Sequence, residues 1–430
     1  MALINQKTDT SYICKYQVPS LVFMLGSKQV VMEFANILSI EKVDDYEFNL
    51  RSILKVSISI DVRKKLWLIK NKDDIVCKFE LDMFGLSQDG ETEVVDPVNI
   101  FNARFGIYFN DNDDSTDTDA LETTIDNYSG EDISTTNTNE DGYFSSDNVL
   151  DVYLFDKDLT NASNKTYNKV YTKATVQQMI AQLLTETKHK RVLMSPIENN
   201  EIYYEKLVPA NKAYKGLAWI DEWYGLYKRG SIIYYDTDIL YIINPNGKCT
   251  VKQKGEWEET TILVTSRSNS IPGNGMVRKP REKKYYINVP EENVNSKKLS
   301  TDMNAKYGSS AKIVVAKSTT IDTAEADQSY MNQRNENITY VTKSSGKYTT
   351  SMTKARMEEN EVILYINAGS VDIRAFTPNK VYKIIFEETS KQKKYGKYRY
   401  RLVYAYHYIA AESGDYMQSS HRIILKRCAT

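Results

Sequence analysis

Three histidines, His189, His407 and His421, are the residues on which a serine or cysteine hydrolase would have to depend. In such enzymes a histidine removes the proton from the attacking hydroxyl or thiol. None of the three lies in a nucleophile elbow or a zinc-protease histidine pair, and the chain contains no nucleotide-binding phosphate loop or dinucleotide-binding glycine motif. We expect structural roles for all three and assign no catalytic or cofactor-binding residue.

Paired carboxylates are a second route to chemistry, because a glycosidase needs two acidic side chains on either side of the bond it cleaves. Acidic residues such as Glu222 and Asp236 could form such a pair only in three dimensions. A peptidoglycan-degrading hydrolase therefore remains an alternative. We predict that the protein is not an enzyme.

Calcium binding is the third kind of chemistry that the residue types could support. The run from Asp111 to Glu122 places oxygen-bearing side chains where a calcium-binding loop has its first, third, fifth, seventh, ninth and twelfth positions. Thr116 stands where that loop needs glycine, and no amphipathic helix flanks the run. Between 111 and 147 there are twelve acidic residues and no Lys or Arg, which favours a flexible, solvated acidic insert. We assign no metal site, and calcium binding stays open.

The cysteines and the basic clusters also have structural interpretations. Cys14, Cys77, Cys249 and Cys428 are far apart, with no zinc-type spacing, so we expect buried thiols. Basic clusters occur at 278–284 and 391–399, the second interleaved with tyrosines as in nucleic-acid-binding surfaces. We favour a charged hairpin tip at Tyr395-Gly396 that faces protein partners.

The composition is that of a soluble assembly protein. Hydrophobic residues make up 41%, charged residues 26%, and the net charge of -1 gives no overall attraction for nucleic acid or anionic membranes. No apolar stretch is long enough to span a membrane, and the start lacks a signal-peptide pattern, so we expect synthesis in a cytoplasm and no stable membrane association. The 32 tyrosines suit half-buried strands and wet interfaces.

The elements that would position these residues are mostly strands. Alternating polarity predicts strands over 55–62, 65–69 and 149–155, and again at many places after 251. Helical spacing of Val176, Met179, Ile180, Leu183 and Leu184 predicts one helix, and Asn211 is the expected N-cap of a second that runs to Tyr224. Paired strands should follow at 227–236 and 238–243. We therefore predict a first β-barrel domain (1–110), the acidic insert (111–147), an α/β middle domain (148–250) and a second β-barrel domain with irregular insertions (251–430).

The middle section resembles baseplate hub proteins of contractile-tailed bacteriophages. The likeness rests on the helix at 175–184, the helix at 211–227 and the strands at 228–235 and 238–243. Residues 371–384 and the long strand from Tyr398 to Tyr408 look like the closing tube-type barrel of that family. The N-terminal hub region of non-contractile phage tail-tip proteins is similar, but the chain end at Thr430 favours the compact hub.

The resemblance implies a mainly β fold with two tail-tube-like antiparallel barrels joined by an α/β domain. It implies a homotrimer, a pseudo-sixfold ring in the virion baseplate that links the tail tube to the central spike and lines the channel for tape measure and DNA. Expected partners are the tail tube protein, the spike and other baseplate proteins. No cofactor is expected. The alternative binding function is a receptor- or glycan-binding tail-tip protein, with Trp223 and Trp257 as stacking platforms.

Overall fold

Most described residues belong to strands, which confirms the mainly β fold. The computed structural model describes residues 10–47, 51–87, 93–109, 149–228, 230–244, 260–266, 275–279, 284–297, 312–316, 338–342, 362–411 and 416–428. The acidic insert at 111–147, with its calcium-type run, lies outside the described residues, as do Cys249 and Trp257. No helix in the described ranges is long and apolar enough to cross a membrane.

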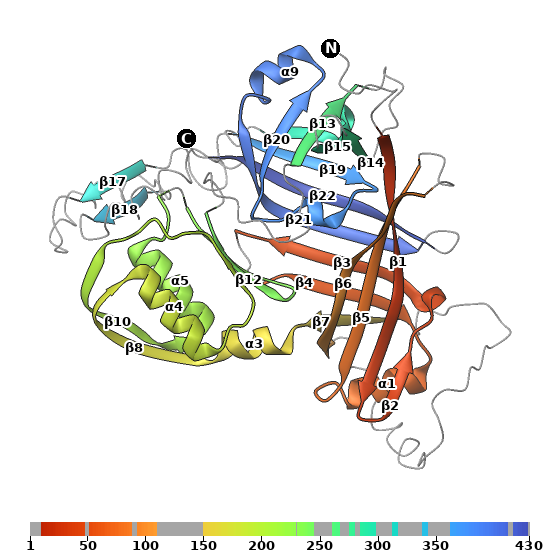
Figure 1. The fold of residues 1–430 in the computed structure, drawn as a ribbon, viewed down its shortest axis with the longest axis horizontal. Helices are drawn as coiled ribbons and strands as arrows, with labels where there is room; N and C mark the ends of the chain where they lie inside the picture. The colour runs from red at the N-terminus through yellow and green to blue at the C-terminus, as the bar shows by residue number, and fades with distance from the viewer. Residues whose placement is uncertain are drawn as a thin grey trace.

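A 15-stranded sheet closes on itself in two places (Figure 1). The first closed circuit, which we call the first barrel, follows antiparallel pairings throughout. Its strands in order around the circuit are β1 (Thr10–Leu25), β5 (Val76–Leu86), β6 (Glu93–Tyr108), β7 (Val149–Phe155), β4 (Ile53–Ser59), β3 (Ile37–Asp45), β21 (Arg399–Ala411) and β22 (Met417–Arg427). The short β2 (Lys28–Val31) pairs with the end of β1.

The second circuit, the second barrel, reuses β21 and β22. From β22 it runs through β19 (Ile363–Gly369) to β16 (Val294–Lys297). The 3-10 turn η4 (Glu291–Asn293) joins β16 to β15 (Lys284–Pro290) along the chain, and strand pairing does not close this step in the described residues. β15 pairs with β13 (Thr260–Thr265), and β20 (Val381–Phe386) completes the circuit to β21. β14 (Gly275–Lys279) connects β15 to β1. β13 is parallel to both β15 and β20, unlike the antiparallel pairing expected throughout.

The two barrels therefore share a strand pair, and neither is contiguous in the sequence. Figure 1 shows β21 and β22 between β3 and β4 on one side and the strands β13, β19 and β20 on the other. β7, β21 and β22 enter the first barrel from beyond residue 110. Strand pairing thus crosses the expected domain boundaries at 110 and 250, which remain a prediction.

The middle module, residues 157–243, packs helices against a strand pair. It contains α3 (Lys157–Asn164), β8 (Thr166–Thr175), α4 (Val176–Thr187), β9 (Val192–Met194), β10 (Ile202–Lys212), α5 (Ala213–Tyr224), β11 (Ile232–Asp236) and β12 (Ile239–Ile243). All five apolar residues that predicted the first helix are buried on α4. Thr175 and Gln178 form a capping box at its start, which satisfies two free backbone N–H groups.

Three local expectations differ from the structure. Residues 65–69, expected as a strand, belong to α1 (Val62–Lys70), because the Asp61 carboxylate accepts from the backbone N–H of Lys64 and starts a helix. Asn211 is not an N-cap: β10 continues past it, and Asn211 lies opposite Tyr167 in the strand pair. The basic cluster at 391–399 connects the paired strands β20 and β21 as expected, but it contains a short helix, α9 (Thr389–Lys394).

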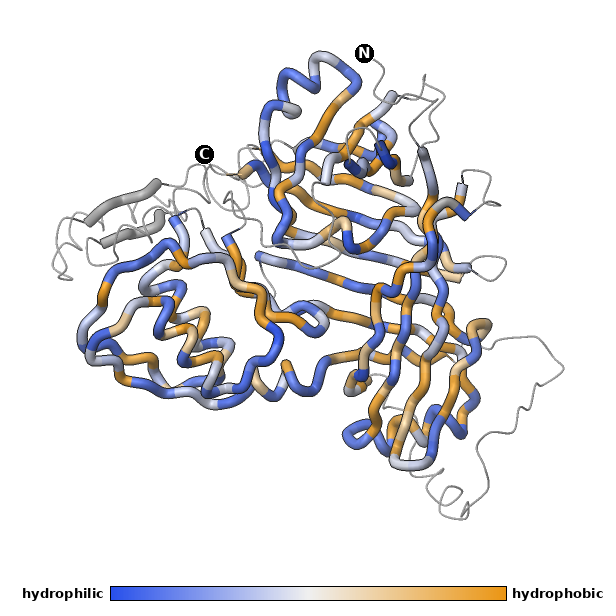
Figure 2. The backbone as a smooth tube through the Cα atoms, viewed as in Figure 1, coloured by the Kyte–Doolittle hydropathy of each residue, from blue (hydrophilic) through white to orange (hydrophobic). Residues whose placement is uncertain are grey.

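The apolar side chains form one large core in the barrels, a second in the middle module and a small third cluster of Leu263, Val277 and Tyr286. Figure 2 shows hydrophobic and hydrophilic residues alternating along the barrel strands, as two-faced strands require. The three-stranded sheet β11-β12-β9 contributes to both cores, since Tyr234 and Ile243 pack with the barrels while Tyr235 and Ile242 pack with α4 and α5. The remaining described pieces are η1 (Phe34–Asn36), η7 (Ile373–Ala375) and the parallel pair β17 (Lys312–Ala316) and β18 (Ile338–Thr342).

Candidate functional site at the shared strands and the module junction

The shared strand pair is tied to β1 by the segment 370–376, which we call the anchor segment. The hydroxyl of Tyr16 on β1 donates to the carbonyl of Val371 (2.7 Å) and accepts from the N–H of Ile373 (2.9 Å). The backbone of Ser370 bonds both Cys14 and Ser419, at 2.8 and 2.9 Å. Buried backbone groups are costly when unpaired. The anchor segment therefore joins the N-terminal strand to the C-terminal strand pair.

Two of the three histidines meet at this place. His407 on β21 and His421 on β22 are both about 1% exposed, and their Nδ1 atoms lie 2.8 Å apart. His421 Nε2 is 2.9 Å from the Val371 carbonyl, which only accepts, so this nitrogen carries the proton. His421 Nδ1 then accepts a hydrogen bond from His407 Nδ1. The ring of Phe376 packs against both imidazoles.

Burial keeps this histidine pair neutral. It lowers the pKa of His421 to about 4, although the Val371 carbonyl and Asp372 partly offset this effect. It lowers the pKa of His407 well below its ordinary value, and the His421 ring lowers it further. Neither histidine contacts a nucleophilic side chain suited to acyl transfer, since the neighbouring Ser419 bonds the ring nitrogen that carries the proton. The expected structural role of these two histidines agrees with this geometry.

A charged cluster fastens the middle module to the first barrel. Lys42 on β3 lies between two carboxylates: it pairs with Asp44 on the same strand and, at 2.8 Å, with Asp236 at the end of β11. The Tyr234 hydroxyl donates to the other Asp44 oxygen at 3.0 Å. The Lys42 and Asp44 side chains are 8% and 0% exposed. We call Lys42, Asp44, Tyr234 and Asp236 the junction cluster.

The electrostatics of the junction cluster follow from burial and charge count. Burial raises the pKa of Asp44, and Lys42 opposes that shift. The pKa of Asp236 is lowered, since Lys42 and the N–H and hydroxyl of Thr237 outweigh its desolvation. The two carboxylates in turn raise the pKa of Lys42 against its burial. One cation thus serves two buried anions, and the cluster depends on its presence.

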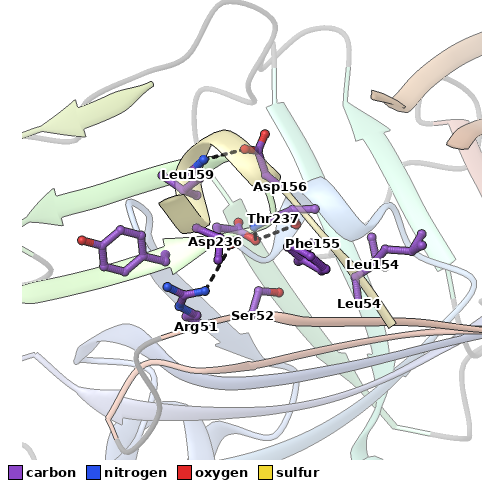
Figure 3. Close-up of a pocket in the computed structure, with 11 residues that line it drawn as sticks. Arg51, Ser52, Leu54, Leu154, Phe155, Asp156, Leu159, Asp236 and Thr237 are labelled. Atoms are coloured by element: carbon purple, nitrogen blue, oxygen red, sulfur yellow. Dashed lines mark hydrogen bonds between the residues drawn. The ribbon is translucent and has the colours of Figure 1, made fainter. Parts of the chain in front are cut away.

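Beside the junction cluster lies a small pocket of about 40 Å³ (Figure 3). Arg51, Asp156, Tyr235 and Thr237 line it, and Arg51 donates to Thr160 and Ser163 on α3. A volume of this size holds a few water molecules at most and excludes a sugar ring. The pocket is therefore a small gap where α3, β4 and β11 pack against one another.

The proposed carboxylate pair of a hydrolase is not brought together. Asp236 is bound by Lys42 and Thr237, whereas Glu222 is exposed on α5 and is not among the groups that contact Asp236. The His189 side chain lies just after the end of α4 and contacts two hydroxyls. Its Nδ1 lies 2.7 Å from the Thr187 hydroxyl, and its Nε2 lies 3.2 Å from the Tyr235 hydroxyl. In the described ranges no group of three or more potential metal ligands occurs.

The thiols and the aromatic candidates lie apart from these clusters. Cys14 and Cys77 are fully buried free thiols, as expected, whereas Cys428 is only half-buried. Trp223 on α5 is 60% exposed, with the half-buried Trp219 ring 5.8 Å away. Near the second barrel, the basic residues of α9 include Lys391, which pairs with Glu291 and Glu388.

Sequence reasoning did not single out Lys42 or Asp44. A signal was present: within Glu41-Lys42-Val43-Asp44-Asp45, the strand period of two places Lys42 and Asp44 on the same face as the apolar Ile40. Opposite charges two residues apart on a buried strand face indicate an internal ion pair.

A family model described as Bacteriophage PBS1 gene 109 protein matches residues 107–428. The chain belongs to this family. The matched residues run from the end of β6 to the end of β22 and include the middle module, the anchor segment and the shared strands. This membership confirms the resemblance to bacteriophage proteins. Among curated proteins, none matches the chain.

Solved structures similar to this family member include two tail proteins and a type VI secretion component. A tail protein from Neisseria meningitidis MC58 is 11% identical, with 97% of this chain and 96% of that one covered and a TM-score of 0.48. The 43 kDa tail protein of prophage MuSo2 from Shewanella oneidensis is 7% identical, with 94% and 97% covered and a TM-score of 0.42. An E. coli type VI secretion component, described as structurally similar to T4 tail proteins gp27 and gp5, is 10% identical, with 97% and 77% covered and a TM-score of 0.39.

Proposed function

We propose that the chain is a structural virion protein: a tail baseplate hub that forms a homotrimer and joins the tail tube to the central spike. The observation that carries this proposal is the pair of strand circuits that share β21 and β22 within one chain. Because the shared strands fix one barrel against the other, three copies around a threefold axis would present six barrels. A ring of that kind has a pseudo-sixfold face for a tube and a threefold face for a spike.

An open strand edge supports assembly by continued sheets. β6 pairs with β5 along its length, but it meets β7 only at Gly106, Ile107 and Tyr108. From Glu93 to Phe105, its second edge has no strand neighbour in the described part of the chain. Open edges bind further strands unless they are protected. Pro97 lies on this strand and would limit the register in which a partner strand adds.

The proposed role is mechanical and requires no catalysis. The hub would lie in the virion baseplate after synthesis in the host cytoplasm, contact the tube, the spike and other baseplate proteins, and line the channel for tape measure and DNA. The buried, neutral histidine pair and the buried ion pairs of the junction cluster suit a rigid structural subunit.

The test is the solution mass of the purified 49.5 kDa chain by light scattering, followed by negative-stain imaging of the same peak. We expect a trimer with a threefold outline and a central hole. A chain that stays monomeric after tube and spike proteins are added would refute the hub.

Glycan binding is the second candidate function, and the exposed Trp223 is the observation that favours it. An exposed indole next to another indole is a suitable platform for the apolar face of a sugar. Glycan-array binding that is lost in Trp223→Ala, while the fold is unchanged by circular dichroism, would support this function. Peptidoglycan zymography tests the hydrolase alternative, and a clear band at the mass of the chain would contradict a purely structural role.

A further inference from the structure

The strand pair β8–β10 exposes an apolar surface on the side that faces away from the helices. α4 and α5 cover its inner side, where Tyr167, Tyr171, Ala174 and Val208 are buried in the core of the middle module. Its outer side carries Val170, Ile202, Tyr204 and Leu207, which are 65, 49, 61 and 49% exposed. We call these four residues the hairpin face. Clustered exposed apolar side chains of this kind mark binding surfaces.

The strand register brings these side chains together. Val170 lies directly opposite Leu207, so their side chains form a cross-strand pair. Tyr204 lies opposite Lys173, whose Nζ is 6.0 Å from the centre of its ring. Glu205, between Tyr204 and Leu207, has a left-handed backbone with a φ of +52°, and Tyr204 and Leu207 on either side of it are both exposed.

The hairpin face is surrounded by positive charge. The two strands carry four lysines (Lys169, Lys173, Lys206 and Lys212) against one carboxylate, Glu205. Lys169 pairs with Glu186 on α4. The other three form no ion pair with any residue that the structure describes. An apolar centre with unpaired cations at its rim suits a partner with carboxylates around apolar side chains.

One segment of this chain has that composition. Residues 111–147 carry twelve acidic residues without a single Lys or Arg, and Leu121, Ile125, Tyr128 and Ile133 are distributed among them. We propose that the hairpin face binds this acidic segment, from the same or a neighbouring copy, with its apolar side chains on Val170, Tyr204 and Leu207 and its carboxylates at the lysines. The proposal goes beyond the hub function and does not depend on it.

The test is zero-length carbodiimide cross-linking of the full-length protein, which forms an amide only where a lysine touches a carboxylate. Cross-linked peptides are identified by mass spectrometry after digestion with trypsin and Asp-N. We expect the acidic segment to be joined to Lys173, Lys206 or Lys212 at least fivefold more often than to Lys393 and Lys394, which are exposed on α9. Mixing copies with different nitrogen isotopes shows whether the link lies within one chain or between two.

A second variant separates docking from simple charge attraction. Val170→Ser with Leu207→Ser removes apolar contacts but leaves every lysine in place, and both positions are exposed enough for the fold to be retained. We expect the hairpin cross-links to fall at least fivefold, whereas Val31→Ser, at an equally exposed valine on β2, should leave them unchanged. Equal cross-linking at the hairpin and α9 lysines, or unchanged yields in the double variant, would overturn the proposal.

Discussion

Replacement of Lys42 by methionine tests the junction cluster most directly. Methionine keeps most of the side-chain volume, so the change removes the charge and leaves the packing largely intact. Asp44 and Asp236, with side chains 0 and 16% exposed, then remain buried without their cation. Breaking a buried pair in this way costs about 3–5 kcal/mol of stability. Because Lys42 serves both carboxylates, we expect a loss at the upper end of that range at pH 7.

The pH dependence distinguishes this explanation from a packing defect. In the variant, both carboxylates lack a cation, so their pKa values rise and they take up protons as the pH falls. Protonation removes the uncompensated charge, and the stability difference from the native chain should shrink between pH 7 and pH 4. In the native chain the direction for Asp236 is opposite: its lowered pKa stabilises the fold at neutral pH, and this contribution is lost on acidification.

Equilibrium unfolding in urea, followed by circular dichroism at pH 7 and pH 5, measures both effects. Lys393→Met on the exposed surface of α9 is the matched control and should change stability by less than about 0.5 kcal/mol. Adding Asp44→Asn to Lys42→Met should recover part of the loss, because one of the two buried charges is removed. A loss below about 1 kcal/mol for Lys42→Met, or a loss independent of pH, would refute the reasoning.

Three further predictions follow from the anchor segment and the buried thiols. Tyr16→Phe leaves the Ile373 N–H without its acceptor and removes one of the hydrogen bonds that the Val371 carbonyl accepts, so we expect a loss of about 1–3 kcal/mol in the same unfolding assay. His421, with its folded pKa near 4, should destabilise the chain by roughly 3 kcal/mol as the pH falls from 7 to 4, since only the unfolded state takes up the proton; His421→Gln should lack this component. Cys14 and Cys77 should resist a thiol reagent until denaturant is added, because both are buried and burial raises their pKa values; fast native-state labelling would contradict this.

The periodic elements were predictable from the sequence because their signals are local. α4 was predicted by five apolar positions at helical spacing, and β11 and β12 by two apolar runs around a short turn. α1 was missed because the spacing of Leu66 and Leu68 fits a strand as well as a helix. Only the N-cap at Asp61 distinguishes the helix from a strand. Asn211 was misassigned because its pairing with Tyr167 depends on a strand far along the chain.

The sites depend on contacts that no local pattern contains. Tyr16 and Val371 are separated by 355 positions, and Asp44 and Tyr234 by 190. The meeting of His407 with His421 depends on the pairing register of β21 with β22. Residue types were therefore recognised, but their neighbours were not. The sharing of one strand pair by two barrels likewise depends on long-range register and was not expected.

The shared strand pair also sets the order in which the chain can be completed during synthesis. β1 and β3 are made early, but their neighbours β22 and β21 lie at 417–427 and 399–411. At a ribosome speed of 5–20 residues per second, roughly 15–60 s pass between the appearance of β6 and that of β22. During that time the first barrel has an unpaired seam along β3. During synthesis, nascent chains therefore carry an open sheet edge, and the protection of this edge by chaperones or by rapid release would limit how much of the protein is produced.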